Sequence, residues 1–417
     1  MSRRLLGRAV DLLQVGLGPA VVDPAFRIAE GLSPGTKERT RHEVYGARGE
    51  AFVARASMAE KVGFFAKMVG TLGASLALAP ARASTRGPRS KPHGDALPEL
   101  LVGGDLLQPE ALSASTFSEA LRARIRQAQA LVVNLEGTLS PAPAELSPFQ
   151  TWRGIKQLLT YAFNADTPEW VSRVSEQGLA DLVRELGPIV LNVANNHTLD
   201  DGDGGFARTV DVARGLGAVV GDARSGHGGV IVPVGPYRVG LLGVSYGHNR
   251  VGVAKSPHLG FSAVPYEVSV ASFAGIVADL TSRGATHTVA LLHWGHEHEH
   301  TPTEAQRRTA RALFEAGVTV ICGHHPHLLQ TTEEVDGHVV VYSLGDLVGG
   351  DRTVWSRHGA LASLRPAPDG TMVVTLVPTV QTPFYRGQRT MLLAEAPWLE
   401  RAVHALFFKW KSPWEVS

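Results

Sequence analysis

Histidines are concentrated in one short stretch of the chain, LLHWGHEHEHTP at residues 291–302. His293 directly follows an apolar run, and three more histidines come at alternate positions after it. In an extended chain alternate side chains share a face, so His293 and Glu297 lie on one face and the three later histidines on the other. His293 is therefore the expected metal ligand, and Glu297 is the candidate to orient it or a substrate group. The other three histidines are expected to form a solvated rim, and they could still donate hydrogen bonds to an anionic substrate.

Polar side chains that suit a metal follow other apolar runs as well. In an open α/β sheet the carboxyl ends of the strands meet at one crevice, so such residues can lie together despite wide sequence separation. Carboxylates, amide oxygens and imidazoles bind divalent ions such as Mn²⁺, Fe²⁺ or Zn²⁺. A bridging carboxylate can hold two ions about 3.5–4 Å apart, a spacing suited to activating water. The candidate ligands are Asp105, Glu136, Asn196, His293, His325 and His327, with His197 beside them.

The elements that must position these residues alternate along the chain. Short apolar runs followed by helical patterns indicate an α/β protein with buried strands. The last helix of the series is expected to begin with a capping box of Thr301 and Glu304, with Pro302 at its first position. Strands are expected at 100–106, 130–137, 189–197, 237–245, 286–295, 318–327 and 338–346, and helices at 115–129, 176–186, 204–217, 268–284 and 301–317.

Composition limits the class of protein. The chain has 417 residues, 44% hydrophobic and 19% charged, which describes a globular protein that buries a core. Its single cysteine, Cys322, excludes an intramolecular disulfide framework and suits a reducing compartment. Residues 1–97 carry 15 Lys and Arg against 8 Asp and Glu, whereas the rest carries 25 against 31. A weakly acidic body with a basic arm does not indicate a nucleic-acid reader.

The basic arm ends in a linker rich in proline, glycine and serine near residues 82–98. We expect a largely helical extension at 1–97, a main domain at 98–385 and a helical tail at 386–417. The arm contains an apolar stretch near residues 62–84, but Lys67 interrupts it, and it lies too far along the chain for a secretory signal. The expected location is cytoplasmic, with the arm either merely solvated or in peripheral contact with a membrane or an anionic polymer.

Taken in order, the motifs resemble a known family. An aspartate at the first strand end is followed by NLEG, ANNH, HWGHE, GHHPH and YSLG, with FNAD at 163–166. From about 99 to 350 the chain resembles the CapA/PgsA-type poly-γ-glutamate capsule synthesis proteins, relatives of the calcineurin-like metallophosphatases. The resemblance implies a four-layer α/β/β/α sandwich around two divalent metal ions.

The resemblance also implies a role for each site residue. Asp105 and His327 would bind the first ion, and Glu136 would bridge the two. His197 would sit beside the ions without binding them, either as a general acid or as a residue that holds Asn196 in place. The ligands of the second ion would be Asn196, His293 and His325.

Three positions depart from the related patterns. The first motif has Gln108 where metallophosphatases usually have a histidine, so the first ion lacks one imidazole. Glu136 is one methylene longer than the usual bridging aspartate. Asp346 replaces the asparagine of Ser-Leu-Gly-Asn, and we interpret it as a turn residue rather than as a further carboxylate of the site.

Two functions of different class are compatible with this pattern. One is a metal-dependent hydrolase or transferase that acts on a phosphoester, acyl phosphate or γ-glutamyl substrate. The other is a non-catalytic assembly or export factor for an anionic polymer such as poly-γ-glutamate. The nearly complete ligand set favours the enzyme, whereas the basic arm and Gln108 favour the assembly factor.

Overall fold

The computed structural model of the chain describes most of the region after residue 97. The expected extension at 1–97, the stretch 163–166 and Glu297 all lie outside the described residues. The described ranges are 98–107, 112–141, 172–222, 229–246, 269–295, 302–349, 356–382 and 389–407.

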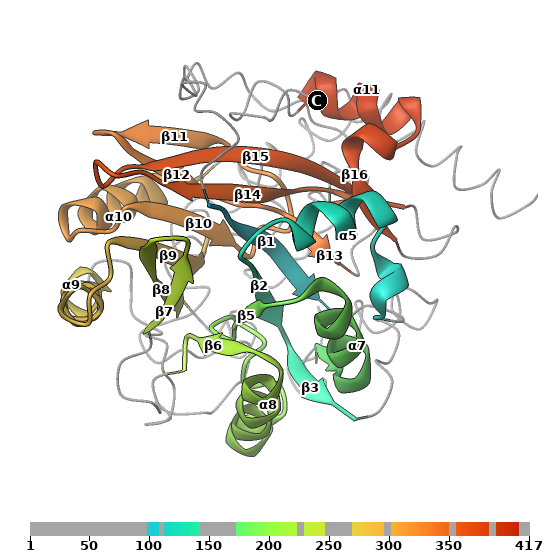
Figure 1. The fold of residues 1–417 in the computed structure, drawn as a ribbon, viewed down its shortest axis with the longest axis horizontal. Helices are drawn as coiled ribbons and strands as arrows, with labels where there is room; N and C mark the ends of the chain where they lie inside the picture. The colour runs from blue at the N-terminus through green and yellow to red at the C-terminus, as the bar shows by residue number, and fades with distance from the viewer. Residues whose placement is uncertain are drawn as a thin grey trace, which may run out of the picture.

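The first sheet has eight strands within these ranges, in the order β16-β15-β14-β1-β2-β5-β6, with β13 beside β1 (Figure 1). Its parallel part is β1 (Leu100–Leu107), β2 (Ala130–Glu136), β5 (Ile189–Asn192), β6 (Ala218–Val220) and β13 (Asp346–Val348). Its antiparallel part is β14 (His358–Pro366), β15 (Met372–Gln381) and β16 (Thr390–Leu392).

The second sheet has six strands in the described ranges, in the order β11-β12-β10-β9-β8-β7. The four strands in the middle of this order, β12, β10, β9 and β8, run parallel, as expected for apolar runs buried on both faces. The strands are β7 (Gly229–Val234), β8 (Tyr237–Ser245), β9 (His287–His293), β10 (Val320–His324), β11 (Thr332–Val335) and β12 (His338–Val341).

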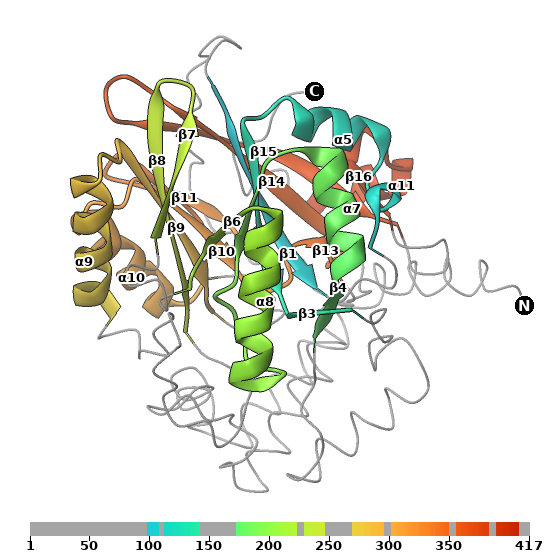
Figure 2. The ribbon, with the colours of Figure 1, turned by 60° about the horizontal axis from the view of Figure 1, so that its bottom comes forward.

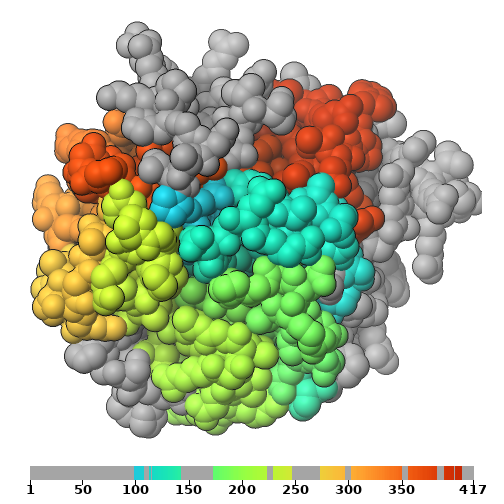
Figure 3. All heavy atoms as spheres, in the orientation of Figure 1, coloured from blue at the N-terminus to red at the C-terminus, as the bar shows by residue number. Residues whose placement is uncertain are grey.

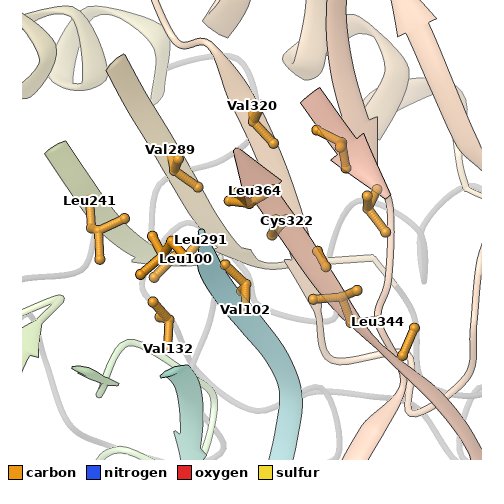
Figure 4. Packing of buried hydrophobic residues seen from close by; sticks show 14 of the residues in the cluster. Leu100, Val102, Val132, Leu241, Val289, Leu291, Val320, Cys322, Leu344 and Leu364 are labelled. Atoms are coloured by element: carbon orange, nitrogen blue, oxygen red, sulfur yellow. The ribbon is translucent and has the colours of Figure 1, made fainter. Parts of the chain in front are cut away.

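The two sheets pack face to face through one apolar cluster. Val102 and Val132 from the first sheet share this cluster with Leu241, Leu291 and Cys322 from the second (Figure 4). All five side chains are almost completely buried, and each large aliphatic one contributes about 1.5–3 kcal/mol when removed from water. Cys322 is a fully buried core residue, and its burial raises the pKa of the thiol to about 12.

Helices cover the outer face of each sheet. Against the first sheet lie α5 (Glu119–Arg126), α7 (Glu176–Leu186) and α8 (Gly202–Leu216). Against the second lie α9 (Ser269–Ser282) and α10 (Glu304–Glu315), seen on the other side in Figure 2. In Figure 3 the teal and green atoms of the first group form a broad surface over that side. The four-layer α/β/β/α order is therefore confirmed.

The start of α10 differs from the expectation. Its N-cap is Thr303, whose hydroxyl accepts from the backbone N–H of Gln306, while the Gln306 side chain accepts from the Thr303 backbone N–H. The predicted box of Thr301 and Glu304 is therefore wrong by two residues. The sequence contains two overlapping Thr-x-x-Glu/Gln patterns, and the second one, which leaves Pro302 outside the helix, is the one used.

The C-terminal part adds strands as well as a helix. The antiparallel pair β14 and β15, which the motif analysis did not resolve, extends the first sheet beyond β1. In the segment interpreted as a helical tail, β16 pairs with β15 before α11 (Trp398–Phe407) begins. Two short strands, β3 (Thr138–Ser140) and β4 (Arg173–Ser175), pair separately. None of the helices in the described ranges has the length and apolarity that crossing a bilayer requires.

Candidate metal centre

A row of polar side chains crosses the first sheet where its parallel strands end. Asn192 of β5 is in register with Asn134 of β2, which is in register with Asp105 of β1, and Asp105 is in register with Asp346 of β13. Asn192 Nδ2 donates to Asn134 Oδ1 over 3.0 Å, and Asn134 Nδ2 donates to Asp105 Oδ1 over 2.7 Å. All four side chains are completely buried. Neighbouring strands thus deliver them to one place.

A close approach of two backbones puts Asp105 in this row. Its N–H donates to the carbonyl of Gly345 over 3.0 Å, beside an irregularity in the pairing of β1 with β2. A Cβ at Gly104 would lie 1.8 Å from the same carbonyl oxygen, a distance that no real side chain tolerates. Only glycine therefore allows β1 and the start of β13 to meet here.

The second sheet brings histidines to the same place. His293 ends β9 and is in register with His324, which ends β10. His324 Nε2 lies 3.1 Å from the carbonyl oxygen of Gly103 and donates to it, which joins the second sheet to the first. Asn134 Nδ2 lies 3.2 Å from His293 Nδ1, a second contact between the sheets.

The turn after β10 carries two more histidines in an unusual backbone conformation. His325 and His327 have φ values of 94° and 57°, a region that non-glycine residues rarely adopt and that costs about 1–3 kcal/mol each. The backbone N–H of His325 donates to Asp105 Oδ2 over 3.0 Å. The strained turn thereby holds both rings over the row of the first sheet.

Two groups of potential ligands result. Glu136, His293 and His325 form one group, and Asp105, His327 and Asp346 form the other; in each group one ligand atom per residue lies within 4.8 Å of the others. Glu136 Oε1 lies 3.6 Å from His293 Nε2 and 3.8 Å from His327 Nε2, so it stands between the groups. Hard carboxylates and imidazoles in two adjacent groups are a donor set that fits two divalent ions.

The electrostatics of the centre also favour cations. Burial alone would lower the pKa of His327, but Glu136, Asp346 and Asp105 together raise that pKa well above its usual value. Burial and the neighbouring histidines lower the pKa of His293 well below the usual value, so His293 is neutral. The negative potential of three buried carboxylates, which favours a proton on His327, equally favours a bound metal cation.

Asn196 and His197 lie in the turn after β5. Asn196 Oδ1 accepts from His293 Nε2 over 2.9 Å, a separation that also suits two ligands of one ion at bond lengths of about 2.0–2.2 Å. His197 Nδ1 donates to Asp200 Oδ2 over 2.7 Å. Asn195 shapes the turn, because its side chain donates to the carbonyl of Leu135 and accepts from the backbone N–H of His197.

The structure brings the predicted ligands together. Asp105, Glu136, Asn196, His293, His325 and His327 all lie in this centre, and His197 lies beside Asn196. Glu297 and the three histidines at 296, 298 and 300 are outside the described residues, so their roles stay predictions.

Three residues of the centre were missed or misread in the sequence. The interpretation of Asp346 as only a turn residue is wrong, because its buried carboxylate contacts His327. Asn134 was overlooked, although it shares a strand face with Glu136 and interrupts an apolar run, which is a signal for a buried polar role. Asp200 follows His197 by three residues in a polar turn, and nothing in its spacing alone marks it as the partner of that histidine.

Comparison with known proteins gives one family. The family model described as "Bacterial capsule synthesis protein PGA_cap" matches residues 92–351, which include all the ligands described above.

Similar individual proteins point the same way. The chain is 30% identical over 204 residues to "PGA biosynthesis protein CapA" of Bacillus subtilis (strain 168), covering 46% of this chain and 50% of that protein. It is 28% identical over 176 residues to "Probable polyglutamine synthesis accessory protein MT0602" of Mycobacterium tuberculosis (strain CDC 1551 / Oshkosh), covering 39% and 46%. The chain thus spans about half the length of the curated relatives it matches.

Sequence identity to solved structures is much lower than identity to these relatives. The purple acid phosphatase PPD1 from yellow lupin (Lupinus luteus) seeds matches with 11% identity and a TM-score of 0.29, over 73% of this chain and 55% of that one. A likeness of this size carries no information about activity.

Proposed function

This chain belongs to the PGA_cap family of bacterial capsule synthesis proteins, and we propose that it is a metal-dependent hydrolase or transferase for an anionic substrate. One observation carries the proposal. Six side chains with metal-binding atoms, from strands of both sheets and from the turn after β10, meet in a buried centre. Burying three carboxylates together is costly unless a cation compensates them, so a cation is the simplest reason for this arrangement.

The ligands divide between two ions. Asp105 and His327 would hold the first, Asn196, His293 and His325 the second, and Glu136 both. Two such ions would supply an activated water and stabilise the negative charge that develops on a substrate oxygen. For His293 to bind an ion through Nε2, the proton that Nε2 now donates to Asn196 would have to move to Nδ1, because a neutral imidazole carries one ring proton and the metal-binding nitrogen must be unprotonated.

His197 is the proposed general acid. Its Nδ1–H is committed to Asp200, so Nε2 is the nitrogen that can exchange a proton with a substrate. Asp200 is fixed in turn, because its Oδ2 accepts from the backbone N–H of Ser172 over 2.5 Å. Burial raises the pKa of Asp200 despite the nearby His197, so this carboxyl group binds a proton more readily than an exposed one. Asp200 would therefore orient His197, and Nε2 of His197 would exchange the proton with a substrate.

The substrate class is proposed from the names of the relatives together with the centre. The relatives are described as proteins of PGA biosynthesis and of polyglutamine synthesis. A dinuclear centre suits reactions that pass through an oxyanion, so phosphoesters, acyl phosphates and γ-glutamyl bonds are the substrates we propose. The basic residues 1–97, outside the described part, would assist contact with an anionic polymer or membrane surface.

The second candidate is a non-catalytic assembly or export factor for an anionic capsule polymer. Two features favour it: the sequence has Gln108 at the position where related metallophosphatases usually have a histidine, and one relative is described as an accessory protein. The ions would then serve binding and rigidity rather than turnover.

Metal analysis and a substrate panel test the proposal. Protein purified without chelator is analysed for Mn, Fe and Zn, and the metal-free protein is titrated with each ion. We expect up to two ions per chain. Loaded protein is then assayed with a phosphomonoester, a phosphodiester, an acyl phosphate and a γ-glutamyl anilide. Absence of metal uptake would contradict the dinuclear centre, and uptake without turnover of any of these would favour the assembly factor.

A further inference from the structure

Asp346 is held against one side of the His327 ring. Its Oδ1 lies 2.8 Å from His327 Nδ1, and both side chains are buried. An ionised carboxylate only accepts hydrogen bonds, so the proton of this bond belongs to His327 Nδ1. That fixes the ring nitrogen that remains for other partners. It is Nε2, which lies 3.8 Å from Glu136 Oε1, the carboxylate oxygen between the two ligand groups.

The other oxygen of Asp346 is packed against Gly349. A Cβ built on Gly349 would lie 1.9 Å from Asp346 Oδ2 and 2.5 Å from its Cγ, and the three nearest atoms all belong to Asp346. The absence of a side chain at Gly349 therefore makes the space that this carboxylate occupies. Gly349 is itself fixed, because its N–H donates to Gln381 Oε1 over 2.9 Å.

We propose that Asp346 is a positioning residue that orients His327, so that Nε2 of this histidine faces the first metal ion on the side of Glu136. This inference rests on the proposed metal centre. The carboxylate acts through the ring, as carboxylates behind metal-binding histidines do, by selecting the tautomer, fixing the ring plane and making the free nitrogen more basic.

A direct bond from Asp346 to the ion is the competing reading. It requires that Oδ1 give up the hydrogen bond to His327, or that Oδ2 turn away from Gly349. Since one oxygen is engaged by His327 and the other is enclosed beside Gly349, the orienting role needs no rearrangement. The two readings differ in one measurable respect: a positioning residue has no effect of its own once His327 is absent.

A double-mutant cycle on metal affinity tests this difference. Calorimetric titration with Mn²⁺ is carried out on the full chain and on Asp346→Ala, His327→Ala and the double variant. We expect Asp346→Ala alone to weaken first-site affinity by about 10–100-fold. In the His327→Ala background the same change should alter affinity by less than about threefold. Asp346→Asn, which keeps an acceptor oxygen for Nδ1–H, should recover much of the loss. Gly349→Ala, which displaces the carboxylate without removing it, should resemble Asp346→Ala.

Glu99→Gln is the matched control. Glu99 is another buried carboxylate, bound to Arg124, at the opposite end of β1 from Asp105. Its substitution removes the same charge and should destabilise the fold while leaving Mn²⁺ affinity unchanged. An equal loss from Asp346→Ala with and without His327 would overturn the positioning role in favour of a direct ligand. If the unaltered protein took up no ion at all, the proposed function itself would fail, a result distinct from an additive cycle.

Discussion

Two buried clusters of charged residues in this protein differ in the balance of their charges. One is the candidate metal centre, where Asp105, Glu136 and Asp346 surround His327. The other lies under α11 and consists of Arg357, His358, Glu400 and His404, which we call the α11 cluster; each of its members is at most 6% exposed. In the α11 cluster Arg357 Nη2 donates to Glu400 Oε1 over 3.0 Å, and His358 Nε2 donates to Glu400 Oε2 over 3.1 Å.

The pKa values of Glu400 and His327 reflect this difference in charge balance. Burial would raise the pKa of Glu400, but the hydrogen bond from His358 and the charge of Arg357 lower it to about 2. The single carboxylate of the α11 cluster is thus matched by an arginine. In the metal centre several carboxylates raise the pKa of one histidine, which means that negative charge exceeds what that ring alone balances. A buried carboxylate paired with arginine indicates a structural clamp, whereas carboxylates gathered around imidazoles indicate a site for a cation.

The largest effect is expected from His197→Ala, which should lower turnover without changing the metal content. His197→Ala removes the proposed proton donor but no ligand, so turnover of a substrate found in the panel should fall by about 10²–10⁴-fold with metal content unchanged. The measurement is kcat together with metal analysis of the same sample. His325→Ala is the comparison variant and should lose metal and turnover together. An unchanged kcat for His197→Ala would leave that residue only its role in holding the turn.

The next largest effect is expected from a substitution that disrupts only the α11 cluster. Arg357→Met leaves the Glu400 carboxylate buried without its arginine, and we expect a loss of about 3–5 kcal/mol in the free energy of unfolding. Urea denaturation measures it, and the affinity for metal should not change in the folded protein. Arg184→Met is the control, because Arg184 is 71% exposed in its pair with Asp181 and should matter by less than about 0.5 kcal/mol. A comparable loss in the two variants would mean that Arg357 does not clamp the α11 cluster.

Removal of metal should lower the stability of the protein by the same amount whether or not the α11 cluster is intact. A ligand that binds only the folded chain, present at 100 times its dissociation constant, stabilises by about 2.7 kcal/mol, so a chelator should lower the unfolding free energy by that amount. The same difference is expected in Glu400→Gln, because distant sites contribute additively. Thermal or urea unfolding with and without chelator measures both. A metal effect that shrinks in Glu400→Gln would show that the two clusters are coupled.

The effect that is smallest per step of the titration is the pH dependence of the α11 cluster. Burial and the nearby His358 lower the pKa of His404 to about 3, from a usual value near 6.5. Between these values the unfolded chain binds a proton that the folded chain does not, so stability falls as pH drops below 6.5, by up to about 1.4 kcal/mol per pH unit. Glu400 acts in the same direction below its unfolded pKa near 4.5. His404→Phe should therefore flatten the curve of unfolding free energy between pH 6.5 and 4.5, whereas an unchanged slope would assign it to other histidines.

The sequence predicts one of these clusters far better than the other. Ligands at the ends of parallel strands follow a simple rule, because each strand is an apolar run and its polar successor must lie at the common edge. Asp105, Glu136 and His293 are found in this way. Arg357 and Glu400 belong to β14 and α11, and they meet only through the tertiary packing of the chain's last part, which no local spacing reports.

The misreading of Asp346 has the same cause. In sequence it follows Gly345 and looks like a turn residue, and only the pairing of β13 with β1 shows that it stands beside Asp105. The start of α10 was misplaced for a local reason instead, since two capping patterns overlap and packing chooses between them. Local chemistry thus predicts strand ends well, and pairings between distant parts of the chain poorly.

The contact between the His325 backbone and Asp105 joins residues 220 positions apart in the chain. A ribosome adds about 5–20 residues per second, so about 10–45 s separate the synthesis of the first ligand from that of the turn that meets it. During this interval Asp105 and Glu136 exist without the two histidines of the turn after β10. A nascent chain that ends before residue 325 would contain four of the six proposed ligands and would lack the two histidines of the turn after β10. The proposed centre can therefore assemble only late in synthesis, after the turn that carries His325 and His327 has been made.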